Sequence, residues 1–217
     1  MISQRAQSAF ERGQEFEARG DLTRAISAYR EAIAIQSDWA VPYQCLGALY
    51  LGMGRYDEAA ATFRQAKLIP LPGDGSVDDM LHVLDQMQKG ALNPAAYRYY
   101  VMARDLPEEQ LDEKRALCQK ALSLNPNYAA AYAELGKVLL AQGYPNQART
   151  VLERGLACDP TPFTRALLLF NLGNVLLASK LRGEALAAFR QVLELDANLS
   201  ATRFAWIQLE AATAGRI

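Results

Sequence analysis

A pattern of apolar and small residues recurs along this 217-residue chain about every 34 residues. In the clearest copies, four residues spaced i, i+3, i+4 and i+7 are followed by three residues spaced i, i+4 and i+7. Each set occupies one face of an α-helix. The clearest copy, residues 129–162, contains Tyr132, Leu135, Gly136 and Leu139, then Ala148, Leu152 and Gly155. A repeat of this length predicts an all-α array of stacked helical hairpins.

Three further copies keep the same order of large and small residues. Residues 6–39 match well, although Ala9 and Arg12 replace the first two large residues, which fits an end repeat whose outer face meets water. Residues 40–73 contain Gly52 and Gly54 where the turn of the hairpin is expected. The stripes of the three copies are Gly13, Phe16, Ala25, Tyr29 and Ala32; Tyr43, Leu46, Gly47, Tyr50, Ala59, Phe63 and Ala66; and Leu169, Leu172, Gly173, Leu176, Ala185, Phe189 and Val192.

A fifth, degenerate copy lies between residues 95 and 128. Tyr99, Met102 and Ala103 restore the first stripe, but Lys114 stands where a small residue is expected. The turn around Pro107 is also one residue short. The sequence therefore predicts a hairpin here with altered packing.

The repeat resembles the tetratricopeptide repeat, which has large, large, small and large residues on its helix A, then small, aromatic and small residues on helix B. The resemblance implies a right-handed superhelix, an α-solenoid, in which small residues let helices approach closely. We expect Gly47, Gly136 and Gly173 to face Ala59, Ala148 and Ala185. The expected segments are two repeats in 6–73, an inserted helix (77–89) and linker in 74–94, the degenerate repeat in 95–128, two repeats in 129–199 and a capping helix in 200–217.

Composition narrows the classes of function. The formal net charge is −1 and the chain has one histidine, His82, and three separated cysteines, Cys45, Cys118 and Cys158. A nucleic-acid partner, a metal site, a cofactor and histidine-based catalysis are therefore not expected. Cys118 and Cys158 are expected in the core and Cys45 partly buried. Because no apolar run reaches the roughly 20 residues of a membrane span, we expect a cytoplasmic protein.

In the family that the repeat resembles, partners lie along a concave wall made by helices A. Carried over by position, the lining residues here are Phe10, Gln14, Gln44, Cys45, Ala48, Tyr97, Tyr100, Arg104, Lys137, Phe170, Asn171 and Asn174. A known subclass holds the C-terminal carboxylate of a chaperone peptide with basic and amide side chains. Phe10, Gln14 and Cys45 stand at those positions, so this clamp is absent.

Some of these residues have two interpretations. Tyr97, Tyr100 and Arg104 resemble an anchoring spot for a protein partner, although tyrosines can also stack on bases. Asn171 and Asn174 are candidates for bonds to a peptide backbone, or are part of a polar helix surface.

The sequence thus predicts a non-enzymatic scaffold that binds a peptide or helix in an apolar concave groove. Two alternatives are the substrate-recruiting repeat region of a larger enzyme, such as a glycosyl- or sulfotransferase, and an RNA-binding helical repeat. Self-association is a further alternative, because the inserted helix and Trp206 can expose apolar surface.

Overall fold

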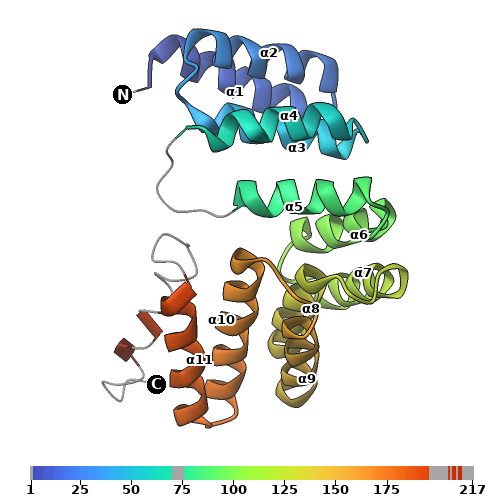
Figure 1. Ribbon diagram of the computed structural model, residues 1–217, viewed down its shortest axis with the longest axis vertical. Coiled ribbons are helices and arrows are strands. Elements are labelled where there is room, and N and C mark those ends of the chain that lie inside the picture. The colour runs from blue at the N-terminus through green and yellow to red at the C-terminus, as the bar shows by residue number, and fades with distance from the viewer. Residues whose placement is uncertain (1, 70–75, 196–204, 206, 209, 212–217) are drawn as a thin grey trace. The chain divides into compact units, whose positions relative to one another are not determined.

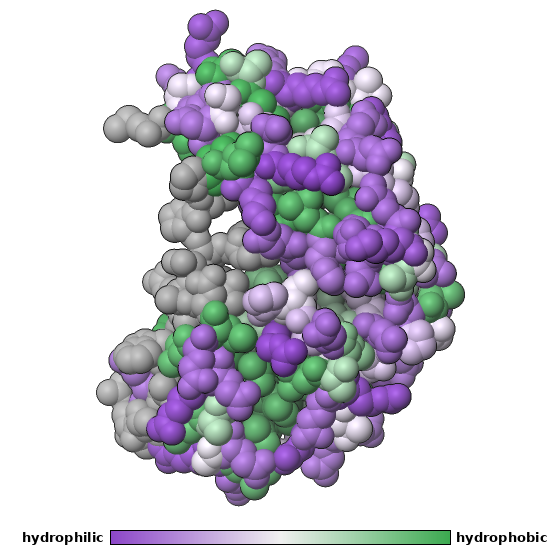
Figure 2. All heavy atoms as spheres, viewed as in Figure 1, coloured by the Kyte–Doolittle hydropathy of each residue, from purple (hydrophilic) through white to green (hydrophobic). Residues whose placement is uncertain are grey.

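The computed structural model describes residues 2–69, 76–195, 205, 207, 208, 210 and 211. Within these residues all regular structure is helical, in α1 to α11 and at the described residues after 204, which confirms the all-α prediction. The chain divides into two compact units, with α1–α5 in the first and α6–α11 in the second (Figure 1). Hydrophilic side chains cover most of the face in view, and hydrophobic ones gather in patches (Figure 2).

The first unit contains two helical hairpins and one further helix. Its helices are α1 (Gln4–Ala18), α2 (Leu22–Ile35), α3 (Ala40–Gly52), α4 (Tyr56–Lys67) and α5 (Ser76–Gln88). The α1/α2 and α3/α4 hairpins stack through α2 and α3, and α5 packs on α4. Lys67 and Asp78 form an ion pair of 2.6 Å between α4 and α5. The inserted helix predicted at 77–89 is therefore present, at Ser76–Gln88.

The second unit contains three hairpins, α6/α7, α8/α9 and α10/α11. Their helices are α6 (Pro94–Asp105), α7 (Leu111–Leu124), α8 (Ala129–Ala141), α9 (Pro145–Leu156), α10 (Pro162–Ala178) and α11 (Arg182–Leu195). The predicted cap at 200–217 falls largely outside the described residues. Those described are helical, and Ala205 is buried beside Phe189 and Val192.

Most hairpin turns need a residue in the left-handed backbone region. Gly20, Gly54 and Gly143 have φ values of 76°, 73° and 81° at equivalent points of three turns. Glycine adopts this conformation without a steric cost, which is why it recurs there. Gly52, also expected in a turn, is instead the last residue of α3.

The glycines of the first helices lie under a large side chain of the second helix. A Cβ atom built on Gly47 would lie 2.9 Å from the ring of Phe63, and Gly136 faces Leu152 in the same way. The atoms nearest to the added Cβ of Gly47, Gly136 and Gly173 belong to Phe63, Leu152 and Phe189, because the residue that follows the expected Ala59, Ala148 and Ala185 in each stripe reaches across the glycine. Gly155 of α9 lies against the next hairpin, where an added Cβ atom would be 2.7 Å from Leu168 of α10.

Candidate functional site

The second unit has an inner and an outer side. Its first helices contact each other, α6 with α8 and α8 with α10, whereas the described residues of α7, α9 and α11 make no comparable contacts with one another. Helices that are closer on one side than on the other form a curved stack. The helices α6, α8 and α10 therefore form the inner wall of this unit, where the sequence placed the lining residues.

A tyrosine–arginine cluster joins α6 to the start of α8 and consists of Tyr97, Tyr100, Arg104 and Tyr128. The ring centroids of Tyr97 and Tyr100 are 6.4 Å apart, and Tyr128 meets Tyr100 edge-on at 5.3 Å. The guanidinium carbon of Arg104 lies 5.9 Å from the centroid of Tyr100. Tyr97 and Tyr100 are half-buried and Arg104 is exposed. Tyr128 was missed at the sequence level, because it precedes α8 and falls outside the helical stripe.

The charge of Arg104 is locally balanced. Its Nε donates a hydrogen bond of 2.8 Å to Asp105. Burial opposes the charged form, but this bond and the nearby carboxylate raise the pKa of Arg104 overall. The cluster therefore presents aromatic surface beside one guanidinium group, and the carboxylate of Asp105 balances the charge of that group.

A lysine–glutamate network adjoins the cluster and consists of Lys114, Glu108, Glu134 and Lys137. The Lys114 side chain is 0% exposed, and its Nζ lies 3.5 Å from Glu134 and 3.7 Å from Glu108. It also donates to the carbonyl of Arg104 at 3.4 Å. Lys137, one of the predicted lining residues, donates to Glu108 at 2.8 Å. This bond raises the pKa of Lys137 against the effect of burial, so Lys137 stays charged on the inner wall.

The predicted residues of α10 serve in part to join helices. The Asn171 Nδ2 donates to the carbonyl of Ala133 in α8 at 3.1 Å, a role that neither of our two interpretations included. Phe170 packs against Phe189 of its own hairpin, with ring centroids 5.9 Å apart. Asn174 is half-buried. Asn171 therefore binds the backbone of a neighbouring helix within the chain.

The predicted residues of the first unit form no comparable cluster. Phe10 is only 7% exposed and packs between Tyr29 and Trp39, with ring centroids 5.6 and 4.9 Å away. Expecting Phe10 on an open wall was wrong, because Trp39, in the connection between α2 and α3, covers it. Of the others, Gln14 and Ala48 are exposed, and Gln44 and Cys45 are half-buried.

The three thiols and the single histidine lie in different surroundings. Burial raises the pKa of Cys45 to about 11 and that of the fully buried Cys118 to about 12, so both are protonated near neutral pH. Cys158 is half-buried, and His82 is exposed beside Gln86.

In the part of the chain that the structure describes, no three His, Cys, Asp or Glu residues gather as metal ligands would. The described helices are also too short or too polar to cross a membrane.

Two family models, both described as "Tetratricopeptide repeat", match the chain. One covers residues 6–38, 42–69 and 166–199, and the other covers residues 107–169. The matches include the four regular repeats and part of the fifth, degenerate repeat.

Individual relatives are distant and longer. Human protein O-mannosyl-transferase TMTC3 is 26% identical over 191 residues, which is 85% of this chain and 19% of the relative. Cellulose synthase operon protein C of Xanthomonas axonopodis pv. citri (strain 306) is 27% identical over 143 residues, or 66% of this chain and 9% of that protein. The chain thus spans about a fifth or less of the length of these relatives.

Among solved structures, the yeast Sti1 TPR2AB domain in its pHSP90 complex superposes with a TM-score of 0.51. The identity is 14%, and the match covers 96% of this chain and 98% of that one. At this identity the likeness supports the fold alone. Since the two family models together match most of the sequence, and the helical hairpins follow the same period, the chain belongs to the tetratricopeptide repeat family.

Proposed function

We propose that the chain is a non-catalytic scaffold that binds a peptide or helix of a protein partner along the inner wall of α6, α8 and α10. The observation that carries the proposal is the tyrosine–arginine cluster, since Tyr and Arg dominate the energetics of many protein interfaces. Rigid aromatic rings lose little conformational entropy on binding, and each offers a polar group at its edge. Lys137 and Asn174 extend the wall beyond the cluster.

The charge distribution favours a protein partner over RNA. The two cations among the predicted lining residues of this wall are paired, Arg104 with Asp105 and Lys137 with Glu108. The net charge of the whole chain is −1. Binding driven by phosphate contacts needs unpaired cations and weakens steeply with salt. We therefore expect partner binding to change little between 50 and 200 mM salt, whereas a steep loss would favour an RNA-binding repeat.

Peptide selection tests the proposed site directly. Random twelve-residue peptides are selected by phage display on the full chain, and their affinities are then measured for wild type, Tyr100→Ala and Arg104→Gln. Each change should weaken binding by about tenfold or more, since hot-spot truncations cost over about 1.4 kcal/mol.

Met102→Ala provides the matched control. Met102 lies on the same helix, α6, and is 53% exposed. Its truncation should leave affinity within about twofold, and thermal melting should show that all variants are folded. Selected peptides that bind Tyr100→Ala and Arg104→Gln as well as wild type would overturn the proposal.

A second candidate is the substrate-recruiting repeat region of a larger enzyme. The observation that favours it is the similarity to human TMTC3, a protein named as a mannosyl-transferase, of which the match covers 19%. Immunoblotting of the native host with an antibody against residues 129–195 separates the two. A band near 24 kDa supports the stand-alone scaffold, and a much larger band supports the second candidate.

A further inference from the structure

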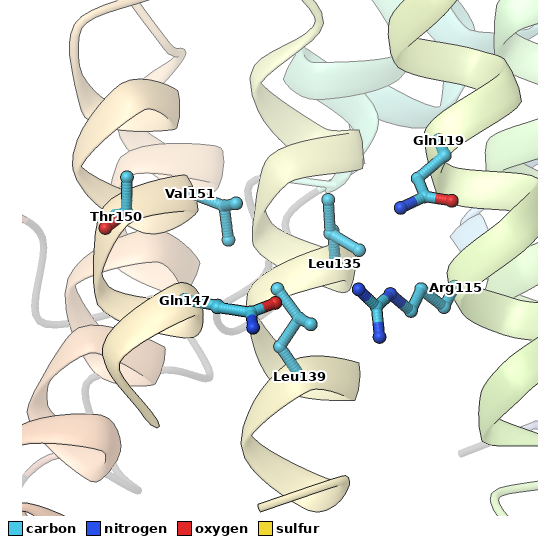
Figure 3. A pocket seen from close by; sticks show the side chains of 7 residues that line it. All are labelled: Arg115, Gln119, Leu135, Leu139, Gln147, Thr150 and Val151. Carbon is cyan, nitrogen blue, oxygen red and sulfur yellow. The ribbon is translucent and has the colours of Figure 1, made fainter. Parts of the chain in front are cut away.

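The outer side of the second unit carries a groove that the repeat pattern does not predict. Because the second helices α7 and α9 are splayed, the first helix between them, α8, forms a floor (Figure 3). The groove has a volume of about 270 Å³. Its lining residues come from three helices: Arg115 and Gln119 from α7, Leu135 and Leu139 from α8, and Gln147, Thr150 and Val151 from α9.

The size and floor of the groove suit one side chain. Pockets that hold whole small molecules usually measure about 300 to 1,000 Å³, so this groove lies just below that range. Its floor, Leu135 and Leu139, and its half-buried wall residue Val151 are aliphatic. An aliphatic side chain would gain contact with all three and leave no polar group buried without a partner.

One rim of the groove carries a cation without an acidic partner. The Arg115 guanidinium lies 5.7 Å from the ring centroid of Tyr144, and no carboxylate of the described residues is within ion-pair distance. On the neighbouring helix, by contrast, Arg149 pairs with Glu153 and Glu184 at 2.8 and 3.0 Å. Arg115 is half-buried, so its position is partly fixed. A carboxylate is the ligand that its planar donor groups fit best.

The two rims also carry amides that can bind a peptide backbone. Gln119 lies on the α7 side and Gln147 on the α9 side, both exposed (Figure 3). Each amide offers donor and acceptor groups to the main chain of an extended segment. The groove thus combines an aliphatic floor, amides on both rims and a single cation.

We propose that this outer groove binds an acidic linear peptide, with one aliphatic side chain on Leu135, Leu139 and Val151 and a neighbouring carboxylate on Arg115. This site shares no residue with the tyrosine–arginine cluster, so it goes beyond the scaffold function proposed above. The chain would then hold two segments at once, one at each site.

A defined probe tests the proposal. The peptide Ser-Glu-Ser-Leu-Ser-Glu-Ser places leucine and both glutamates on one side of an extended chain. It is titrated into the full protein labelled at leucine and valine methyl groups, and the NMR shifts are followed. We expect saturable shifts at Leu135, Leu139 and Val151, and a loss of affinity of about tenfold when the peptide leucine is replaced by serine.

A charge exchange supplies the decisive variant. Arg115→Glu should abolish binding of the acidic peptide and create binding of Ser-Lys-Ser-Leu-Ser-Lys-Ser, which the wild type should not bind. Lys120→Gln is the matched control, because Lys120 also lies on α7 and is exposed but is outside the groove. Its affinity for the acidic peptide should stay within about twofold of wild type.

Three results would overturn the proposal. The first is the absence of methyl shifts in wild type at saturating peptide concentration. The second is a set of shifts confined to the inner wall around Tyr100. The third is that the same methyl shifts appear when protein is concentrated without peptide, which would make a second copy of the chain the occupant.

Discussion

The third and fourth hairpins, α6/α7 and α8/α9, have different side chains where their two helices pack together. In the fourth, Gly136 lies under Leu152, and Ala148 is fully buried. In the third, the corresponding residues are Ala103, Cys118 and Lys114, all fully buried. In the third hairpin a methyl group stands in place of the glycine hydrogen, a small thiol in place of the large side chain, and a lysine in place of the alanine. The difference teaches that the helix crossing accepts different distributions of side-chain size and not one particular set of residues.

The altered turn of the third hairpin leaves a backbone carbonyl near the end of α6 that accepts a hydrogen bond from the Lys114 ammonium. One residue fewer separates Ala103 from Lys114 than separates Gly136 from Ala148. The backbone adopts an extended conformation at Leu106, with ψ of 150°, because the following Pro107 disfavours a helical conformation there. The carbonyl of Arg104, near the end of α6, accepts from Lys114. A buried ammonium thereby satisfies a carbonyl that the helix end leaves without a partner.

The largest expected effect is that of Lys114→Ala. It removes a buried cation, leaves Glu134 mostly buried with only Lys137 at 4.0 Å, and opens a cavity. Breaking a buried ion pair usually costs about 3 to 5 kcal/mol, and we expect about 3 kcal/mol because Lys137 partly compensates. Urea unfolding measures the loss. Lys120→Ala, at an exposed position of α7, removes only the contact of its ammonium with the Tyr99 ring and should cost less than about 1 kcal/mol. Equal costs for the two variants would contradict the role of the buried charge.

Gly136→Ala should have an intermediate effect and tests the fourth hairpin. The new methyl group would overlap Leu152, with a typical overpacking cost of about 1 to 3 kcal/mol. Gly183→Ala is the matched control, because Gly183 is helical in α11 and a Cβ atom there meets nothing within 4 Å. It should stabilise the protein by about 0.5 to 1 kcal/mol through helix propensity alone. Thermal melting separates the two, and a stabilising Gly136→Ala would contradict the close approach of α8 and α9.

The smallest expected effect is that of Glu108→Gln at the exposed edge of the lysine–glutamate network. Glu108 is 64% exposed, so its pair with Lys137 should contribute less than about 1 kcal/mol, and less at high salt. The hydrogen bond from Lys137 lowers the pKa of Glu108 in the folded protein. Its contribution is therefore present above the unfolded pKa of about 4.3 and is lost as the pH falls through the lower folded value. Wild type and variant should converge in stability below about pH 4, and a gap that widens on acidification would contradict this sign.

Much of the fold could be predicted from the sequence, because the period reports which residues face each other in every hairpin. The helix pairs of all five repeats and the inserted helix, α5, lie where the stripes place them. The candidate site was harder to predict. Tyr97, Tyr100 and Arg104 do gather, but Phe10 belongs to the core and Asn171 binds Ala133. Position in a repeat indicates the face of a helix, and it does not reveal what a neighbouring segment places on that face.

The amino-acid order alone determined that this chain forms helical hairpins, since spacing and side-chain size decide which helix faces can come together. Only the tertiary structure decided how Lys114 is accommodated, which aromatic rings meet Tyr100 and where α7 and α9 separate around Leu135. The Lys114 network and the groove each depend on atoms from three helices, and the contacts of Tyr100 join α6 to the residue before α8. A one-dimensional pattern records pairs within a repeat, whereas charge compensation and grooves arise where several repeats meet.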